Sequence, residues 1–205
     1  MATNEPQGKS AYGFDEPILN DHIDPSTADK YAEIIIDEGT SSSLKKIAKL
    51  HGYTYRNIEY KSTGLEFRTP SKTWKLGGDC EDQTILLSSL LLSQGFTVRT
   101  VWVQNHVIPE VLLPWDPGTG LDRKVNDATD ADVDFAVAGD VDRGEGLEGW
   151  WYPVDPEGSR FIGDLKNHYE EDYAVNHGDH WTWNSFENSI AEKSSDYGIK
   201  NAFNS

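Results

Sequence analysis

The sequence Gly-Gly-Asp-Cys-Glu-Asp occupies residues 77–82 and leads directly into a leucine-rich run. Two glycines allow the chain to turn tightly, and Asp79 is a favourable N-cap residue for a helix that begins at Cys80. Leu87 and Leu91 fall on the same helical face as the cysteine, which predicts a buried helix. The only cysteine of the chain is thus expected in a first helical turn, where unpaired N–H groups and the helix dipole favour a thiolate.

Two further helices are predicted before the cysteine helix. The first ends at Gly39, and the second is capped by the serines at 41–43 and ends at Gly52. His51 would then be a helix-end histidine, favoured by the C-terminal dipole, rather than a ligand. Residues 53–76 are predicted to be extended and loop-like, with aromatic side chains as packing anchors.

After the cysteine helix the period of the apolar residues changes from helical to strand-like. Residues 96–103 and 106–113 are predicted to form two strands joined by a turn near 104–105, and residues 150–155 a short aromatic strand that ends at Asp155. Pro109 cannot donate to a sheet ladder, so the second strand is expected to be an edge strand or to carry a bulge.

The composition excludes several classes of partner. The chain has 35 acidic and 18 basic residues, and its net charge is −17. Nucleic acid binding needs a basic surface, and an anionic membrane also attracts basic rather than acidic segments. Strong acidity destabilises a fold through self-repulsion, which concentrated salt screens. The composition therefore predicts a halophilic protein, and acidity that serves only solubility is the alternative.

The sequence also bears on location and on cofactors. Residues 1–7 contain neither a basic segment nor an apolar core, so no signal peptide and no membrane span are predicted. We expect a soluble protein, cytoplasmic or part of a macromolecular assembly. No cofactor or metal is expected. The aspartates at 130–134 lack the later ligands of a calcium loop, and His177 and His180 lack a second pair of zinc ligands.

Three residues, in chain order, supply the groups that an activated cysteine nucleophile requires. A reactive cysteine needs an imidazole to take its proton and an acidic or amide group to orient that imidazole. Cys80 on a helix, His106 on a strand and Asp155 at a strand end are separated by 26 and 49 residues. His106 is predicted to share a sheet face with Ile108 and Leu112 and to face the cysteine helix. Each residue alone has a structural interpretation, but the combination favours catalysis.

Three segments of the chain resemble the transglutaminase-like cysteine peptidase family. They are residues 68–83 with the leucine-rich helix that follows, His-Val-Ile-Pro-Glu-Val at 106–111, and Trp-Tyr-Pro-Val-Asp-Pro at 151–156. The resemblance implies an α+β fold with a papain- or transglutaminase-like core, in which N-terminal helices and the cysteine helix pack on an antiparallel sheet. It also implies that the cysteine, histidine and aspartate named above form a catalytic triad.

The activity that follows is thiol-dependent acyl transfer on peptide or glutamine amides of a peptide or protein substrate. Hydrolysis is favoured because water is the commoner acceptor, and transfer to an amine, which gives a cross-link, stays open. Trp74 and Asp79 are candidate supporting residues; Trp74 is a possible indole donor to the oxyanion, with core packing as its alternative. Glu81 and Asp82 flank the nucleophile and would raise the thiol pKa, so both are expected to point away from the sulfur.

The chain is predicted to divide into three regions. Residues 1–25 form an irregular lead-in, 26–157 form the catalytic core with an acidic excursion at 116–149, and 158–205 form a partly helical extension. The excursion and Pro109 depart from the family pattern. They leave open a non-catalytic structural or binding module of a larger assembly, such as a virus particle or tail, with the extension as its docking segment.

Overall fold

The structure is a computed structural model and describes residues 19, 21–64, 66–103, 106–114, 149–158 and 162. Helices and an antiparallel sheet share the described chain, which confirms the α+β class expected from the sequence. The elements are α2 (Pro25–Ile35), α3 (Ser43–Asn57), α4 (Pro70–Leu76), α5 (Cys80–Ser93), β1 (Val98–Val103), β2 (His106–Leu113) and β3 (Trp150–Pro153).

Several predictions fall outside the described residues. They concern most of the lead-in (1–25), nearly all of the acidic excursion (116–149) and of the extension (158–205), and with them the calcium and zinc interpretations. Among the described residues, no helix is long and apolar enough to cross a bilayer. No group of three or more His, Cys, Asp or Glu side chains in that same part of the chain is arranged to hold a metal ion.

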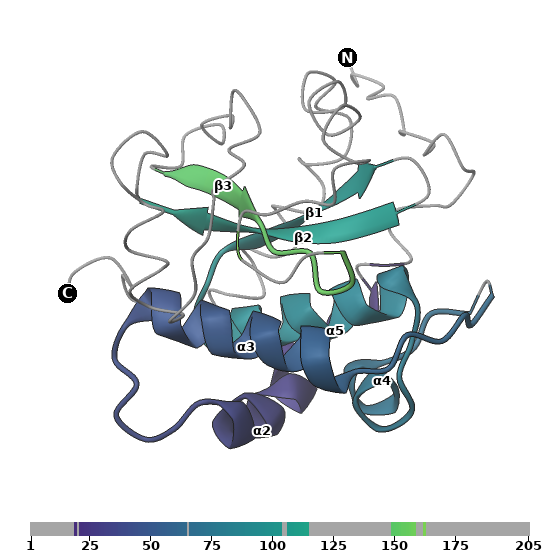
Figure 1. Ribbon diagram of the computed structural model, residues 1–205, viewed down its shortest axis with the longest axis horizontal. Coiled ribbons are helices and arrows are strands. Elements are labelled where there is room, and N and C mark those ends of the chain that lie inside the picture. Colours follow the sequence, from purple (N-terminus) through teal and green to yellow (C-terminus); the bar gives the residue numbers. More distant parts are fainter. Residues whose placement is uncertain are drawn as a thin grey trace, which may run out of the picture.

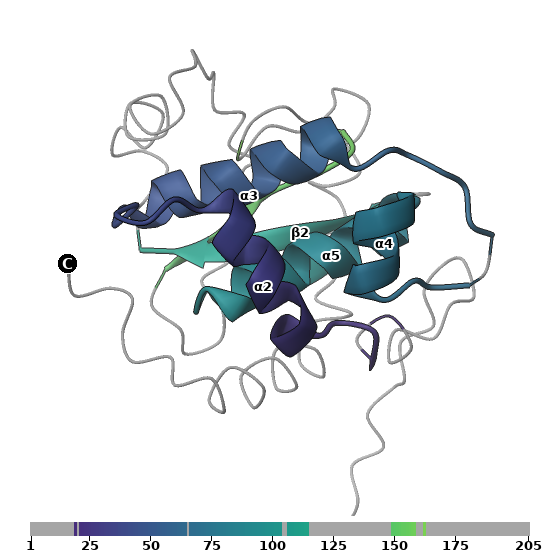
Figure 2. The same ribbon diagram turned by 90° about the horizontal axis from the view of Figure 1, so that it is seen from below.

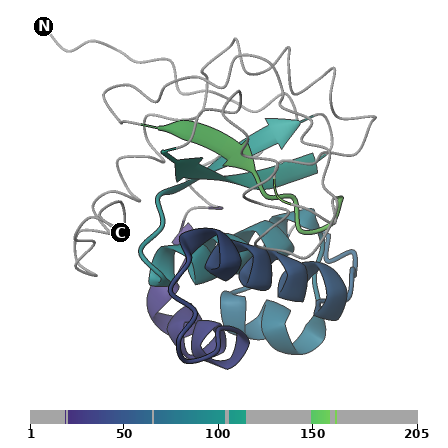
Figure 3. The ribbon, with the colours of Figure 1, turned by 60° about the vertical axis from the view of Figure 1, so that its left-hand side comes forward.

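The described elements form two layers, with the helices on one face of the sheet (Figures 1 and 3). The strands are antiparallel in the order β1-β2-β3. α5 contacts the other three helices as well as β1 and β2, and Figure 2 shows the other helices arranged around it. A helix with this position must be apolar on nearly all sides, and every residue of α5 except Glu81 and Ser93 is buried.

The helices before α5 differ from the sequence prediction in three respects. α2 ends at Ile35 and not at Gly39. α3 continues through Gly52 to Asn57, so Gly52 does not end it and His51 is not a helix-end residue. A glycine inside a helix costs about 1 kcal/mol, and burial of side chains on both sides of Gly52 outweighs that cost. Part of the predicted loop at 53–76 is helical as α4, which begins at Pro70, a residue suited to the first helical position.

β2 is the middle strand, so the prediction that Pro109 marks an edge or a bulge is wrong. Pro109 pairs with Thr100 of β1 in continuous register, and its carbonyl accepts a hydrogen bond of 2.9 Å from Val154, just beyond β3. The nitrogen and carbonyl of one residue in an antiparallel strand point to the same side. The missing N–H therefore faces the end of β3 and removes no bond to β1.

The faces of β2 also differ from the prediction. Val107 and Val111 join the core on the helix side, whereas Leu112 packs with Trp151 in a separate cluster. The expectation that His106, Ile108 and Leu112 share a face toward the cysteine helix is therefore wrong for Leu112. All eight residues of β2 are buried, and a strand that is apolar on both faces carries no alternation that could distinguish them.

Candidate active site

Asp79 caps α5, as the sequence predicts. Its Oδ1 accepts a hydrogen bond of 3.4 Å from the Asp82 N–H. Its Oδ2 accepts bonds of 2.9 and 2.5 Å from the backbone N–H and the hydroxyl of Thr63. Thr63 belongs to the segment between α3 and α4, so the capping residue also ties that segment to the start of α5. These bonds fix the helix end that carries Cys80.

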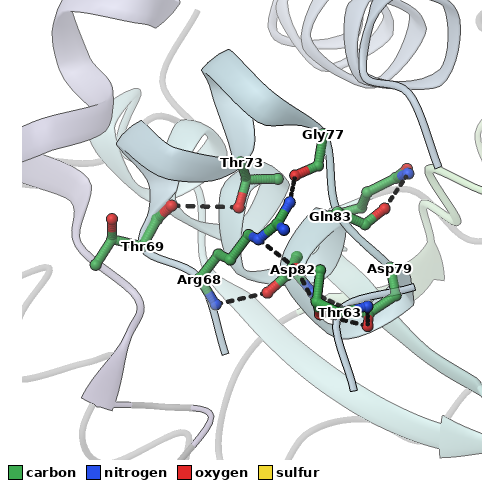
Figure 4. Close-up of polar contacts among 9 residues, drawn as sticks. Thr63, Arg68, Thr69, Thr73, Gly77, Asp79, Asp82 and Gln83 are labelled. Carbon is green, nitrogen blue, oxygen red and sulfur yellow. Dashed lines mark hydrogen bonds and ion pairs between the residues drawn. The ribbon is translucent and has the colours of Figure 1, made fainter. Parts of the chain in front are cut away.

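Asp82 joins a polar network at the start of the helix together with Thr63 and Arg68 (Figure 4). Its carboxylate accepts hydrogen bonds of 2.6 Å from the Arg68 N–H and 3.1 Å from the Thr63 hydroxyl. The Arg68 guanidinium in turn donates to the Gly77 carbonyl at 2.6 Å. Burial raises the pKa of Asp82, and the bond from Arg68 opposes that rise. Asp82 therefore serves the structure of the helix start.

Cys80 is the first residue of α5 and lies beside the start of β2. The residue is buried, with 8% of its surface exposed. Thr84, one helical turn further on, donates a hydrogen bond of 2.9 Å to the Val107 carbonyl. The backbone of Val107 also lowers the pKa of the thiol slightly. The bond from Thr84 thus holds α5 against β2 at Val107, the residue that follows His106.

Glu81 does not point away from the sulfur, and that prediction is wrong. The Cys80 thiol donates a hydrogen bond of 2.8 Å to the Glu81 carboxylate. Burial raises the pKa of the thiol strongly, and the charge and hydrogen bond of Glu81 raise it further, against a smaller lowering by the Val107 N–H. Burial also raises the pKa of Glu81. The thiol is therefore protonated at neutral pH in this arrangement.

The structure brings His106 and Asp155 together across 49 residues. Nε2 of His106 lies 3.0 Å from Oδ1 of Asp155, and the two residues are 1% and 0% exposed. The same oxygen accepts hydrogen bonds of 3.0 and 2.8 Å from the N–H groups of Glu157 and Gly158. Burial by itself would raise the pKa of Asp155. The bonds and charge of His106, with those two N–H groups, outweigh burial and hold the pKa below its ordinary value.

Glu157 and Tyr60 also belong to the site, although the sequence did not single them out. Glu157 Oε2 lies 3.3 Å from Nδ1 of His106. Tyr60 pairs with Gly78 in a parallel bridge, two residues before Cys80, and burial raises the pKa of its phenol, with the negative charge of Glu157 raising that pKa further. The sequence feature that could have indicated Glu157 is its position two residues beyond Asp155. No sequence feature indicates Tyr60, because a tertiary contact, the bridge to Gly78, brings it to the site.

Trp74, the other candidate supporting residue, lies in an aromatic stack. Its ring stacks between Tyr31 and Tyr53, with ring centroids 4.4 and 4.8 Å away. Stacked rings of this kind stabilise the packing between helices. The contacts correspond to the packing alternative for Trp74 and give no support to a role as oxyanion donor.

The candidate site thus contains a buried thiol at a helix N-terminus, bonded to Glu81, and a buried imidazole–carboxylate pair whose imidazole also contacts Glu157. Such a set of groups can carry out proton transfer to the imidazole and attack by sulfur on a carbonyl carbon. Comparison with family models, with curated proteins and with solved structures found no match. The candidate function is accordingly inferred from the residues of this chain.

Proposed function

We propose that the chain is a thiol-dependent hydrolase of peptide or glutamine amides, built on a transglutaminase-like core. Cys80 is the nucleophile, His106 the proton acceptor and Asp155 the residue that orients the imidazole. The observation that carries the proposal is the 3.0 Å bond between the buried His106 and Asp155 side chains. The only cysteine of the chain stands at the start of α5, where backbone N–H groups lie near the sulfur.

The mechanism follows from the partners of the two imidazole nitrogens. Nε2 is bonded to Asp155, so Nδ1 receives the proton when the Cys80 S–H turns from Glu81 toward His106. The sulfur attacks the amide carbonyl carbon, and the C–N bond breaks as the imidazolium returns its proton to the leaving nitrogen. Water then hydrolyses the thioester, which releases the acid and restores the thiol. The backbone N–H of Cys80 is the oxyanion donor.

The rate of alkylation of Cys80 by iodoacetamide near neutral pH tests the proposal. We expect wild-type protein to react faster than free cysteine and His106→Ala to react about a hundredfold more slowly than wild type. His22→Ala is the matched histidine control, since the described ring contact of His22 is with Phe67. Wild-type labelling no faster than free cysteine, or unchanged by His106→Ala, contradicts the proposal.

A non-catalytic module of a larger assembly is the second candidate. The burial of Cys80 and its bond to Glu81 favour it, because both keep the thiol protonated and unreactive. On this alternative the thiol is a packing residue, and its partner is another protein. Slow labelling that is indifferent to His106 supports the module.

The acceptor is decided by a separate measurement. A glutamine-containing protein is incubated with the chain in the presence and absence of a primary amine, and the products are identified by mass spectrometry. Hydrolysis gives new termini or deamidated glutamine in both samples, and Cys80→Ser abolishes both products. Amine incorporation in place of these products identifies a cross-linking enzyme.

A further inference from the structure

We infer that His51 is a positioning residue that holds Asp155 in place for His106, an inference that rests on the proposed function. His51 lies on α3, is 1% exposed, and its Nε2 is 2.9 Å from the backbone oxygen of Asp155, which is 104 residues away in the chain. A carbonyl oxygen can only accept, so Nε2 carries the hydrogen in this bond. The bond fixes the main chain of the residue whose carboxylate meets His106.

The position of His51 on α3 explains why it can make this bond. It shares the buried stripe of the helix with Leu44, Ile47 and Thr54, at helical spacing. The apolar members of the stripe fill the core, and the histidine supplies the one long donor that reaches the chain beyond β3. Because α3 is a continuous helix through Gly52, this donor is held by a rigid element.

The carboxylate of Asp155 is held from the opposite side by the turn that follows it. N–H groups of Glu157 and Gly158 bond to Oδ1, beside the bond to His106. The other oxygen, Oδ2, lies so close to Gly158 that a Cβ there would be 1.8 Å from it. Asp155 is therefore held by its carbonyl through His51 and by its carboxylate through the turn. Movement of either part changes how the carboxylate faces the imidazole.

The experiment compares two substitutions of His51 whose amide side chains place the donor nitrogen at different distances from α3. In His51→Gln the amide nitrogen reaches about as far as Nε2, and in His51→Asn it stops near the place of Nδ1. Thr54→Val is the matched control, since it removes a buried hydrogen bond that Thr54 makes within α3 to Leu50. Alkylation of Cys80 is measured in each variant, alone and combined with His106→Ala.

We expect His51→Asn to slow alkylation about three- to tenfold, the loss of one buried hydrogen bond, and His51→Gln to retain most of the rate. Combined with His106→Ala, His51→Asn has no further effect, because it acts through the imidazole. An unchanged rate in His51→Asn, or equal slowing with and without His106, overturns the inference. Thr54→Val keeps the wild-type rate.

A second readout does not depend on activity. The imidazole proton between His106 and Asp155 is expected as a downfield NMR signal in wild type and His51→Gln, and to be lost in His51→Asn. Alkylation that does not depend on His106 contradicts the proposed function. Loss of the NMR signal in His51→Asn supports positioning by His51 even in that case. A signal unchanged in His51→Asn counts against positioning by His51.

Discussion

Each reactive side chain of the candidate site has a glutamate beside it. The Cys80 thiol donates to Glu81, and Nδ1 of His106, the nitrogen left for the thiol proton, lies 3.3 Å from Glu157. The described arrangement therefore pairs sulfur and imidazole with carboxylates. Reaction requires both contacts to be exchanged for one between thiol and imidazole. Which group receives the thiol proton can be tested at Glu81.

Glu81→Gln is expected to make Cys80 more reactive. The negative charge of Glu81 and its bond to the thiol raise the pKa of Cys80, so removing the charge lowers that pKa. A lower pKa increases the thiolate fraction at any pH below it. We expect alkylation near neutral pH to be about tenfold faster and the rate–pH curve to move to lower pH.

Glu59→Gln is the control for this substitution. Glu59 also carries a negative charge but is exposed and paired with Lys61 at 2.8 Å. Its neutralisation should leave the alkylation rate near that of wild type, because solvent screens an exposed charge. Slower alkylation in Glu81→Gln would show instead that Glu81 serves as the base for the thiol.

At the scale of elements, the turn between α4 and α5 sets where the cysteine helix begins. Gly77 ends α4 with φ of +77°, a conformation that favours glycine, and a Cβ at this position would lie 2.2 Å from the Glu59 carbonyl oxygen. The contact is with backbone, which cannot turn aside as a flexible side chain can. Only glycine therefore fits between the two helices.

Gly77→Ala is expected to lower the free energy of unfolding by about 3 kcal/mol, the sum of a left-handed residue and a backbone clash. Urea unfolding followed by circular dichroism measures the change. Gly64→Ala is the matched control, since Gly64 has φ of +74° but open space around a Cβ. It should cost only about 1 kcal/mol. Equal losses in the two variants contradict a clash at Gly77.

At the scale of the whole molecule, the charge balance predicts a dependence on salt. With 35 acidic against 18 basic residues, the folded chain concentrates like charges that repel one another. The screening length falls from about 10 Å at 0.1 M salt to about 3 Å at 1 M, so this repulsion weakens steeply. We expect the unfolding temperature to rise as potassium chloride is raised over this range.

Sucrose at matching osmolality is the control, because it is excluded from the protein surface and so stabilises the fold, but it screens no charge. The rise in potassium chloride should exceed the rise in sucrose. An unfolding temperature that is indifferent to potassium chloride is evidence against adaptation to high salt and leaves solubility as the reason for the acidity.

The sequence by itself predicted the cysteine helix and the strands of this protein and named the candidate site residues. The start of α5 at Cys80 follows from the Asp79 cap, and its burial follows from a leucine-rich run that is apolar on nearly all sides. The strands follow from β-branched and aromatic runs. These patterns involve residues that are close together in the sequence, so they can be recognised before any tertiary contact is known.

Only the tertiary structure decided how those parts meet. It turned Glu81 toward the sulfur, carried α3 past Gly52, and assigned the helix side of β2 to Val107 and not to Leu112. It also gave His51 its bond to a carbonyl 104 residues away. The physical reason is common to all four: side-chain orientation and burial depend on partners distant in the chain, and local propensity does not contain them.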